Sequence, residues 1–125
     1  MTETELSWLA GWLEGEGTFV VTSGKGPNGK RYPRIRVNAS STDRDVLEHV
    51  QRIAGGIING PYQGSGRFPN GKPVYIWTLS THHQCAPLLR ALQPLMIAAR
   101  RKIQVNKALD AIEAYINTPH GRKAL

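Results

Sequence analysis

The stretch LAGWLEGEG, residues 9–17, closes an apolar segment with two carboxylates, Glu14 and Glu16, that alternate with glycines. Its apolar start predicts a helix over residues 3–15. The C-terminal end of a helix carries partial negative charge and favours Lys or Arg, so each glutamate there costs about 0.3–1 kcal/mol. The two carboxylates therefore need a reason other than helix stability.

Small residues form one stripe along this predicted helix. Ser7, Gly11 and Gly15 are spaced by four positions, so they lie on one face. A glycine inside a helix costs up to about 1 kcal/mol relative to alanine. Such a stripe is useful where another backbone must approach closely.

The rest of the chain alternates between hairpin patterns and helical patterns. Period-two alternation and two Gly- and Pro-rich turns, both containing PNGK, predict two β-hairpins. The predicted elements are helix 3–15 with a capping box of Thr2 and Glu5, strands 18–23 and 34–39, helix 42–54 capped by Thr42, strands 57–63 and 74–79, helix 82–93 capped by Thr81, and helix 97–117. We expect an α+β fold, αββαββα followed by a last helix, with a four-stranded antiparallel sheet covered by helices on one face. Residues 1–117 form one expected domain, and residues 118–125 an expected frayed tail.

Composition favours a nucleic-acid partner. The chain has 125 residues, 40% of them hydrophobic, and a net charge of +7. No apolar run is long enough to span a membrane, and the acidic N-terminus does not resemble a secretory signal. The single cysteine, Cys85, fits an intracellular, reducing compartment. The positive charge favours a polyanion, with nucleic acid ahead of an anionic membrane surface.

The basic residues gather on the two predicted hairpins. No Asp or Glu occurs between Thr18 and Thr42 or between Ile53 and Leu109. A surface of one charge sign favours phosphates, and a two-stranded ribbon can enter the major groove of DNA and contact base edges. The predicted contacts to double-stranded DNA are Thr18, Thr22, Lys25, Lys30, Arg31, Arg34, Arg36, Asn38, Gln63, Arg67, Lys72 and Thr78.

Other kinds of site are disfavoured. Both G-x-x-x-x-G-K strings lack Ser or Thr after the lysine and precede strands, so they are predicted to be turns rather than P-loops. His82 and His83 are adjacent and do not share a helical face, and one cysteine makes no zinc set. Trp8, Trp12, Trp77 and Tyr75 are expected in the core rather than stacked on bases. We expect no membrane or small-molecule partner.

The acidic pair is compatible with phosphates if a divalent cation lies between them. Mg²⁺ takes oxygen ligands, few of them protein carboxylates, and completes its shell with water and phosphate. Residues i and i+2 on a helix point roughly 200° apart. We therefore expect Glu16, next to the strand, to bind the metal and Glu14 to support the structure.

LAGWLEGEG closely resembles the nine-residue signature of the LAGLIDADG homing endonucleases. Ala10, Gly11 and Gly17 match it outright, and Trp12, Leu13, Gly15 and Glu16 are familiar variants. The fold of that family has the same αββαββα order, so the resemblance covers nearly the whole chain.

The resemblance implies a site-specific double-strand DNA endonuclease that cuts a long, nearly palindromic site and leaves short 3′ overhangs. It implies Mg²⁺, with Mn²⁺ able to substitute, bound by Glu16 and the carbonyl of Gly15. One signature per chain implies a homodimer whose signature helices pack together. The implied interface consists of Ser7, Ala10, Gly11, Glu14 and Gly15.

One part of the family pattern is altered. Members often carry a lysine shortly after the LxPxL that ends the third helix, and here that place holds Ala99, followed by Arg100, Arg101 and Lys102. We predict that Arg100 and Arg101 take its catalytic role. A polar family residue near the end of the second strand corresponds to Ala39. The alternative on the same fold is a non-cleaving DNA-binding protein or an intron-RNA maturase.

Overall fold

A computed structural model describes residues 1–26, 29–63 and 71–116 of the chain. The helices are α1 (Glu3–Glu16), α2 (Arg44–Ala54), α3 (His82–Leu92), the 3₁₀ turn η1 (Gln93–Leu95) and α4 (Ala99–Ile116). The strands are β1 (Gly17–Lys25), β2 (Arg31–Ser41), β3 (Ile57–Tyr62) and β4 (Val74–Leu79). This order confirms the predicted αββαββα arrangement and the additional helix after it.

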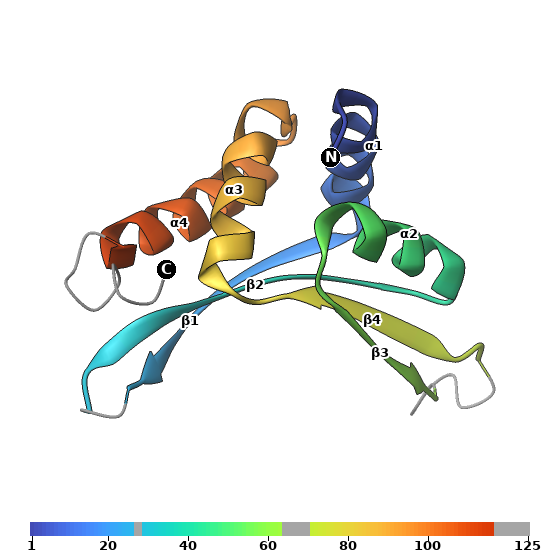
Figure 1. The fold of residues 1–125 in the computed structure, drawn as a ribbon, viewed down its shortest axis with the longest axis horizontal. Helices are drawn as coiled ribbons and strands as arrows, with labels where there is room; N and C mark the ends of the chain where they lie inside the picture. Colours follow the sequence, from blue (N-terminus) through green and yellow to red (C-terminus); the bar gives the residue numbers. More distant parts are fainter. Residues whose placement is uncertain (27–28, 64–70, 117–125) are drawn as a thin grey trace.

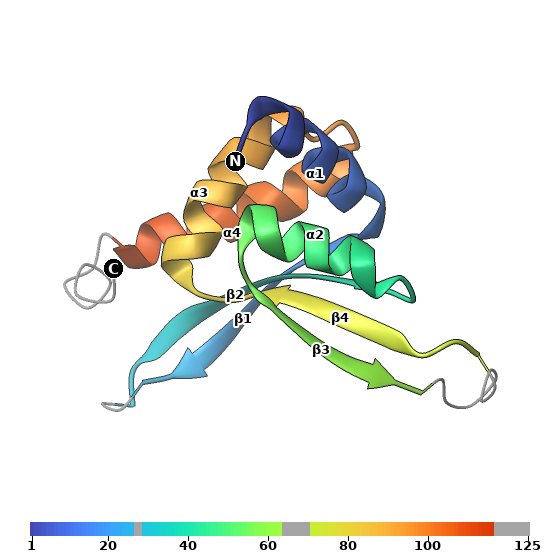
Figure 2. The same cartoon turned by 45° about the vertical axis from the view of Figure 1, so that its right-hand side comes forward.

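The four strands form one antiparallel sheet in the order β1-β2-β4-β3. Figures 1 and 2 show all helices on one face of this sheet. The two hairpins spread apart away from the helices, so the sheet has the shape of a saddle. The hairpins join where β2 pairs with β4, between Val37↔Leu79 and Ser41↔Tyr75. The predicted four-stranded antiparallel sheet with helices on one face is confirmed.

The core lies between the sheet and the helices. In β2 the side chains of Ile35, Val37 and Ala39 are buried, whereas Arg34 and Arg36 between them are exposed. Because successive residues of a strand point to opposite faces, the arginines lie on the helix-free face. The helices close the core with Leu9, Leu13, Leu47, Val50, Leu89, Leu92, Val105 and Ile112.

The first hairpin is longer than predicted. The sequence predicts a loop from 24 to 33, but β1 continues to Lys25 and β2 already begins at Arg31. Contacts from distant parts of the chain support this extension. His82 hydrogen-bonds the carbonyl of Pro33 over 3.1 Å, and the ring of Tyr32 lies 6.3 Å from that of Tyr115 on α4.

Local hydrogen bonds set the ends of α1 and α2. The capping box is confirmed: Thr2 Oγ1 accepts from the Glu5 N–H, and Glu5 Oε1 accepts from the Thr2 N–H. These bonds lower the pKa of Glu5. The predicted cap Thr42 is wrong by one residue, because α2 begins after Asp43, whose N–H donates to Ser41 Oγ.

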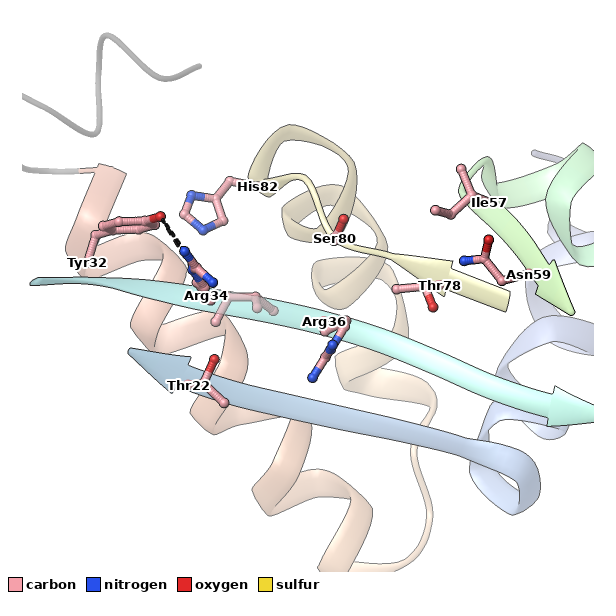
Figure 3. A pocket seen from close by; sticks show the side chains of 10 residues that line it. Thr22, Tyr32, Arg34, Arg36, Ile57, Asn59, Thr78, Ser80 and His82 are labelled. Carbon is pink, nitrogen blue, oxygen red and sulfur yellow. Dashed lines mark hydrogen bonds between the residues drawn. The ribbon is translucent and has the colours of Figure 1, made fainter. Parts of the chain in front are cut away.

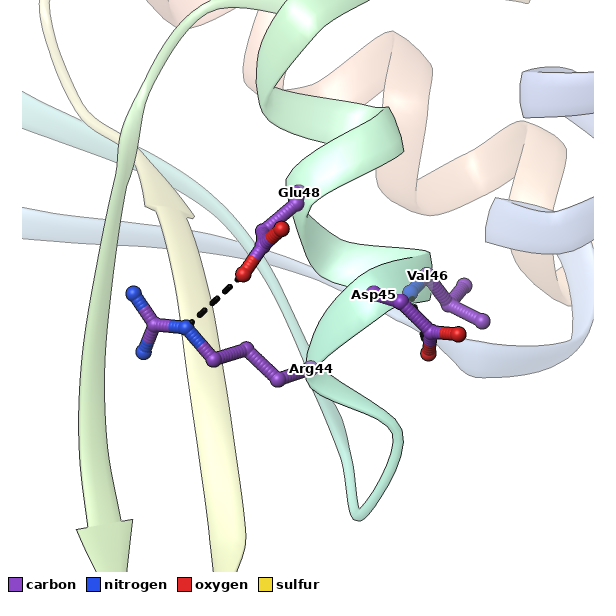
Figure 4. A network of polar contacts seen from close by, with 4 residues as sticks. All are labelled: Arg44, Asp45, Val46 and Glu48. Atoms are coloured by element: carbon purple, nitrogen blue, oxygen red, sulfur yellow. Dashed lines mark hydrogen bonds and ion pairs between the residues drawn. The ribbon is translucent and has the colours of Figure 1, made fainter.

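The first turns of α2 are held to the sheet by Arg44. Its guanidinium pairs with Glu48 at 2.9 Å, one turn along the helix, and Asp45 accepts from the Val46 N–H (Figure 4). The same guanidinium lies 5.2 Å from the centre of the Tyr75 ring on β4. The other end of α2 is fixed by Trp77, whose indole N–H donates to the Gly55 carbonyl over 2.7 Å.

The tryptophans do not all lie in the core. Trp77 is fully buried, as predicted, and Trp12 is partly buried. Trp8 is 40% exposed, so the prediction that it is a core residue is wrong. Its ring stacks on Trp12 at 5.9 Å and makes an edge-to-face contact with His49 on α2.

Candidate nucleic-acid interface and metal site

Strand pairing brings half of the predicted DNA contacts, Thr18, Thr22, Arg34, Arg36, Asn38 and Thr78, into rows on the helix-free face of the sheet. Thr18 of β1 lies opposite Asn38 of β2, which lies opposite Thr78 of β4. Further along, Thr22 lies opposite Arg34. Paired residues share a face of the sheet, so these side chains form one continuous polar surface.

The middle of this face is hollowed. A depression of about 560 Å³ is lined by residues of all four strands, including Thr22, Arg34, Arg36, Asn59 and Thr78. Figure 3 shows both arginines projecting from β2 beside it. Six of the lining residues were not predicted as DNA contacts: Tyr32, Ile35, Ile57, Asn59, Ser80 and His82. Of these, Tyr32 and Ser80 continue the period-two series of β2 and β4, which is the signal that could have revealed them.

Basic residues also lie at the rims of the saddle. Lys25 lies opposite Arg31 at the end of the first hairpin, where Arg31 donates to Ser23 Oγ. Lys30, Gln63 and Lys72 are exposed, beside the strand ends. Arg67 lies outside the described residues. Of the basic residues on the described strands and their turns, five lie on the first hairpin (Lys25, Lys30, Arg31, Arg34 and Arg36) and one, Lys72, lies beside the second.

Glu16 is the last residue of α1 and directly precedes β1. Its side chain is exposed, and in residues 1–26, 29–63 and 71–116 it has no hydrogen-bond or ion-pair partner. Two of the last carbonyls of α1 are already used, since Leu13 accepts from the Gly17 N–H and Glu14 accepts from Arg101. The next carbonyl belongs to Gly15. A free carboxylate beside a helix-terminal carbonyl offers two hard oxygen donors, which fits Mg²⁺.

Arg101 does not occupy a position suited to a catalytic residue. It is only 7% exposed, and its Nε donates to the Glu14 carbonyl at 2.9 Å while Nη1 donates to Gln104 at 3.0 Å. We therefore withdraw the predicted catalytic role and assign Arg101 to the support of α1. Arg100 is exposed at the start of α4 and stays the basic candidate.

The side chain of Glu14 points toward another part of the same chain, the segment before α4. Its Oε1 accepts from the Ile97 N–H at 2.6 Å, and its Oε2 is buried without a partner among the described residues. Ala10 is also turned inward, at 5% exposure, and belongs to the core. Neither side chain offers the free surface that the predicted dimer interface needs.

The remaining small residues of α1 face outward. Ser7, Gly11 and Gly15 are exposed. A Cβ added to Gly11 or Gly15 would meet no atom within 4 Å. The fold of a single chain therefore gives no packing reason for these two helix-weakening glycines.

No family model and no curated protein matches this chain. Solved structures do match it. The homing endonuclease I-CvuI, in complex with the I-CreI target in the presence of 2 mM Mg with the DNA not cleaved, aligns with a TM-score of 0.71 at 15% identity, over 98% of this chain and 73% of that one.

Two further structures match at comparable levels. The archaeal intron-encoded homing endonuclease I-Vdi141I, complexed with DNA, gives a TM-score of 0.60 at 21% identity, over 92% of this chain and 75% of that one. The LAGLIDADG meganuclease I-AabMI, bound to uncleaved DNA, gives 0.63 at 18% identity, over 94% of this chain and 40% of that one. The chain thus has the fold of LAGLIDADG homing endonucleases, as the resemblance of residues 9–17 implied. Within the described residues, every helix is too short or too polar to cross a membrane.

Proposed function

We propose that this protein is a Mg²⁺-dependent, site-specific double-strand DNA endonuclease that acts as a homodimer. The observation that carries the proposal is the position of Glu16, an exposed carboxylate where α1 leads directly into β1, two residues before the exposed Thr18 on the polar face of the sheet. Phosphates repel a carboxylate, so a protein that only binds DNA gains nothing from one at this place. A metal-binding role accounts for it.

Glu16 and the carbonyl of Gly15 are the proposed ligands of this chain. When bound, Mg²⁺, or Mn²⁺ in its place, supplies positive charge that stabilises the phosphorane-like transition state of phosphodiester hydrolysis. The described residues contain no group of three His, Cys, Asp or Glu side chains suited to a metal. The other ligands are therefore expected from DNA, water and a second copy of the chain.

The exposed stripe of α1 supports the proposed dimer. The open space beside Gly11 and Gly15 allows the α1 helix of a second copy to approach closely. Such packing brings two Glu16 side chains together, one for each DNA strand. It also joins two saddles end to end, which suits a long, pseudo-palindromic site.

Arg100 is the proposed basic group near the scissile phosphate. It is exposed two residues after Ala98, whose carbonyl accepts from the N–H groups of Arg101 and Lys102. Its neighbour Arg101 donates a hydrogen bond to the Glu14 carbonyl near the end of α1. Arg100 is therefore the sequence neighbour of the residue that contacts the end of α1, where Glu16 lies.

The test is a cleavage selection on a randomised duplex library in Mg²⁺, with wild type, Glu16→Gln and the control Glu48→Gln. Glu48 is also a surface glutamate, but it pairs with Arg44 on α2. We expect wild type and Glu48→Gln to enrich the same cut site, and Glu16→Gln to bind that site without cutting it. Cutting by Glu16→Gln at the wild-type rate would refute the metal assignment. Sequence-specific binding without cutting by wild type would instead favour the non-cleaving DNA-binding protein.

A further inference from the structure

The side chain of Arg34 is folded along the surface of the first hairpin instead of extending into solvent. It reaches diagonally from β2 to Gly24 of β1, where an added Cβ would clash with Arg34 Nε and lie 3.0 Å from Cζ. Gly24 is buried although it lies on the helix-free face near the end of the hairpin. The missing side chain at residue 24 therefore makes the space that Arg34 fills.

Tyr32 holds the guanidinium in this place. Its hydroxyl accepts from Arg34 Nε at 3.3 Å and from Nη2 at 3.1 Å, and Cζ lies 5.6 Å from the ring centre (Figure 3). Two N–H groups on one edge of the guanidinium are thus engaged. The opposite edge, with Nη1 and the second N–H of Nη2, retains a pair of parallel donors.

Tyr32 is itself fixed to the helical layer. Its ring packs against Tyr115 of α4, whose ring lies 5.1 Å from that of His82 at the start of α3. His82 hydrogen-bonds the carbonyl of Pro33, the residue between Tyr32 and Arg34. The segment 32–34 is therefore anchored on both sides, and Arg34 makes its contacts with Tyr32 in the free chain.

We propose that Gly24 and Tyr32 preset Arg34 to read the N7 and O6 acceptors of a guanine in the major groove. The inference rests on the proposed function, because it needs DNA on this face of the sheet. A pair of parallel donors matches those two acceptors, and a preset side chain loses little rotamer freedom on binding. Arg36, two residues along β2, has no such pair of contacts among the described residues.

The first experiment measures Kd for the duplex enriched by wild type and for a scrambled duplex. Arg34→Ala is expected to weaken binding to the enriched duplex by roughly 5- to 150-fold, the worth of a bidentate base contact. Gly24→Ala and Tyr32→Phe keep the charge and are expected to weaken it by about 2- to 12-fold, the worth of one hydrogen bond. Gly24→Ala and Tyr32→Phe should change binding to the scrambled duplex by less than about 2-fold. Arg34→Ala should weaken binding to the scrambled duplex only by the salt-dependent effect of one lost positive charge.

The mechanism is separated from other effects by combining variants. If Gly24 and Tyr32 act through Arg34, adding Gly24→Ala or Tyr32→Phe to Arg34→Ala should cause no further loss. Replacing the contacted guanine by 7-deazaguanine should weaken wild type but not Arg34→Ala. Additive losses, or equal losses on both duplexes, would overturn the inference. Equal losses on both duplexes would show that Arg34 contacts a phosphate. Additive losses would show that Gly24 or Tyr32 supports the hairpin independently of Arg34.

A measurement without DNA distinguishes this inference from the proposed function. The NMR signal of Arg34 Nε–Hε should exchange slowly with water in wild type and rapidly in Tyr32→Phe and Gly24→Ala. Rapid exchange in wild type overturns the presetting whatever the DNA result. If wild type enriches no duplex, the proposed function fails and the reading of guanine fails with it, while slow exchange would still show Arg34 to be fixed.

Discussion

Arg101 of α4 donates a hydrogen bond from Nε to the backbone carbonyl of Glu14, 2.9 Å away and 87 residues earlier in the chain. The last turn of α1 contains no basic residue of its own. Arg101 therefore supplies the cation that the C-terminal end of this helix favours. Together with the bond from the Ile97 N–H to Glu14, it fixes the end of α1, and with it Glu16, to the start of α4.

Replacing Arg101 by Met should destabilise the protein. The aliphatic part of the side chain is kept, but the Glu14 carbonyl loses its donor at a site where Arg101 is 7% exposed. A buried acceptor without a partner costs about 1–3 kcal/mol, which urea unfolding can measure. The matched control is Arg100→Met, since Arg100 is exposed and its loss should change stability by less than about 0.5 kcal/mol. Equal stability of Arg101→Met and wild type would contradict the supporting role.

Replacing Gly11 by Leu should convert the proposed dimer to a monomer without harming the chain itself. A Cβ at residue 11 meets nothing within 4 Å, so the single chain has room for a side chain. Leucine also favours the helix by close to 1 kcal/mol over glycine. Sedimentation should therefore show a monomer, and circular dichroism should show a helix content at least equal to that of wild type. An unchanged dimer would exclude α1 packing through Gly11.

The sequence contains enough information for the order of elements and the faces of the sheet. Alternation in RIRVNA, residues 34–39, correctly separates the outward arginines from the buried Ile35 and Val37. The 100° step of a helix correctly separates the inward-turned Glu14 from the exposed Glu16. Both patterns depend only on the backbone geometry of neighbouring residues, so the sequence is enough to predict which way these side chains point.

What the sequence could not reveal depends on partners far away in the chain. Arg100 and Arg101 are adjacent arginines that the sequence alone does not distinguish. Only the hydrogen bond to the distant Glu14 carbonyl makes Arg101 structural, while Arg100 stays exposed. Likewise, β1 and β2 pass through a Gly- and Pro-rich segment because Tyr115 and His82 pack there. No pattern within residues 24–33 reports these contacts.

Cys85 should be unreactive in the folded protein. It is fully buried, its Sγ contacts the Leu79 carbonyl at 3.4 Å, and burial raises the pKa of its thiol to about 11. At pH 8 the thiol is protonated, so labelling by a thiol reagent should follow unfolding, with full reaction in denaturant. Because the folded pKa lies above the unfolded value of 9.0, this group contributes stability below pH 9 that is lost as the pH rises through 11. The fall in stability from pH 9 to 11 should therefore be steeper in wild type than in Cys85→Ala, and equal slopes would contradict the burial argument.

Replacing Lys30 by Ala should weaken DNA binding without changing which sequence is preferred. Lys30 is exposed in the turn of the first hairpin, next to Arg31 at the start of β2, where it suits contact with a phosphate. Loss of one phosphate contact should reduce the slope of log Kd against log salt concentration by about 1, equally for all duplexes. Lys30→Arg keeps the charge and should restore the slope. Arg34→Ala, in contrast, should relax the preference at one base pair. A loss of sequence preference in Lys30→Ala as large as in Arg34→Ala would mean that the hairpin turn, and not the hollow of the sheet, reads the bases.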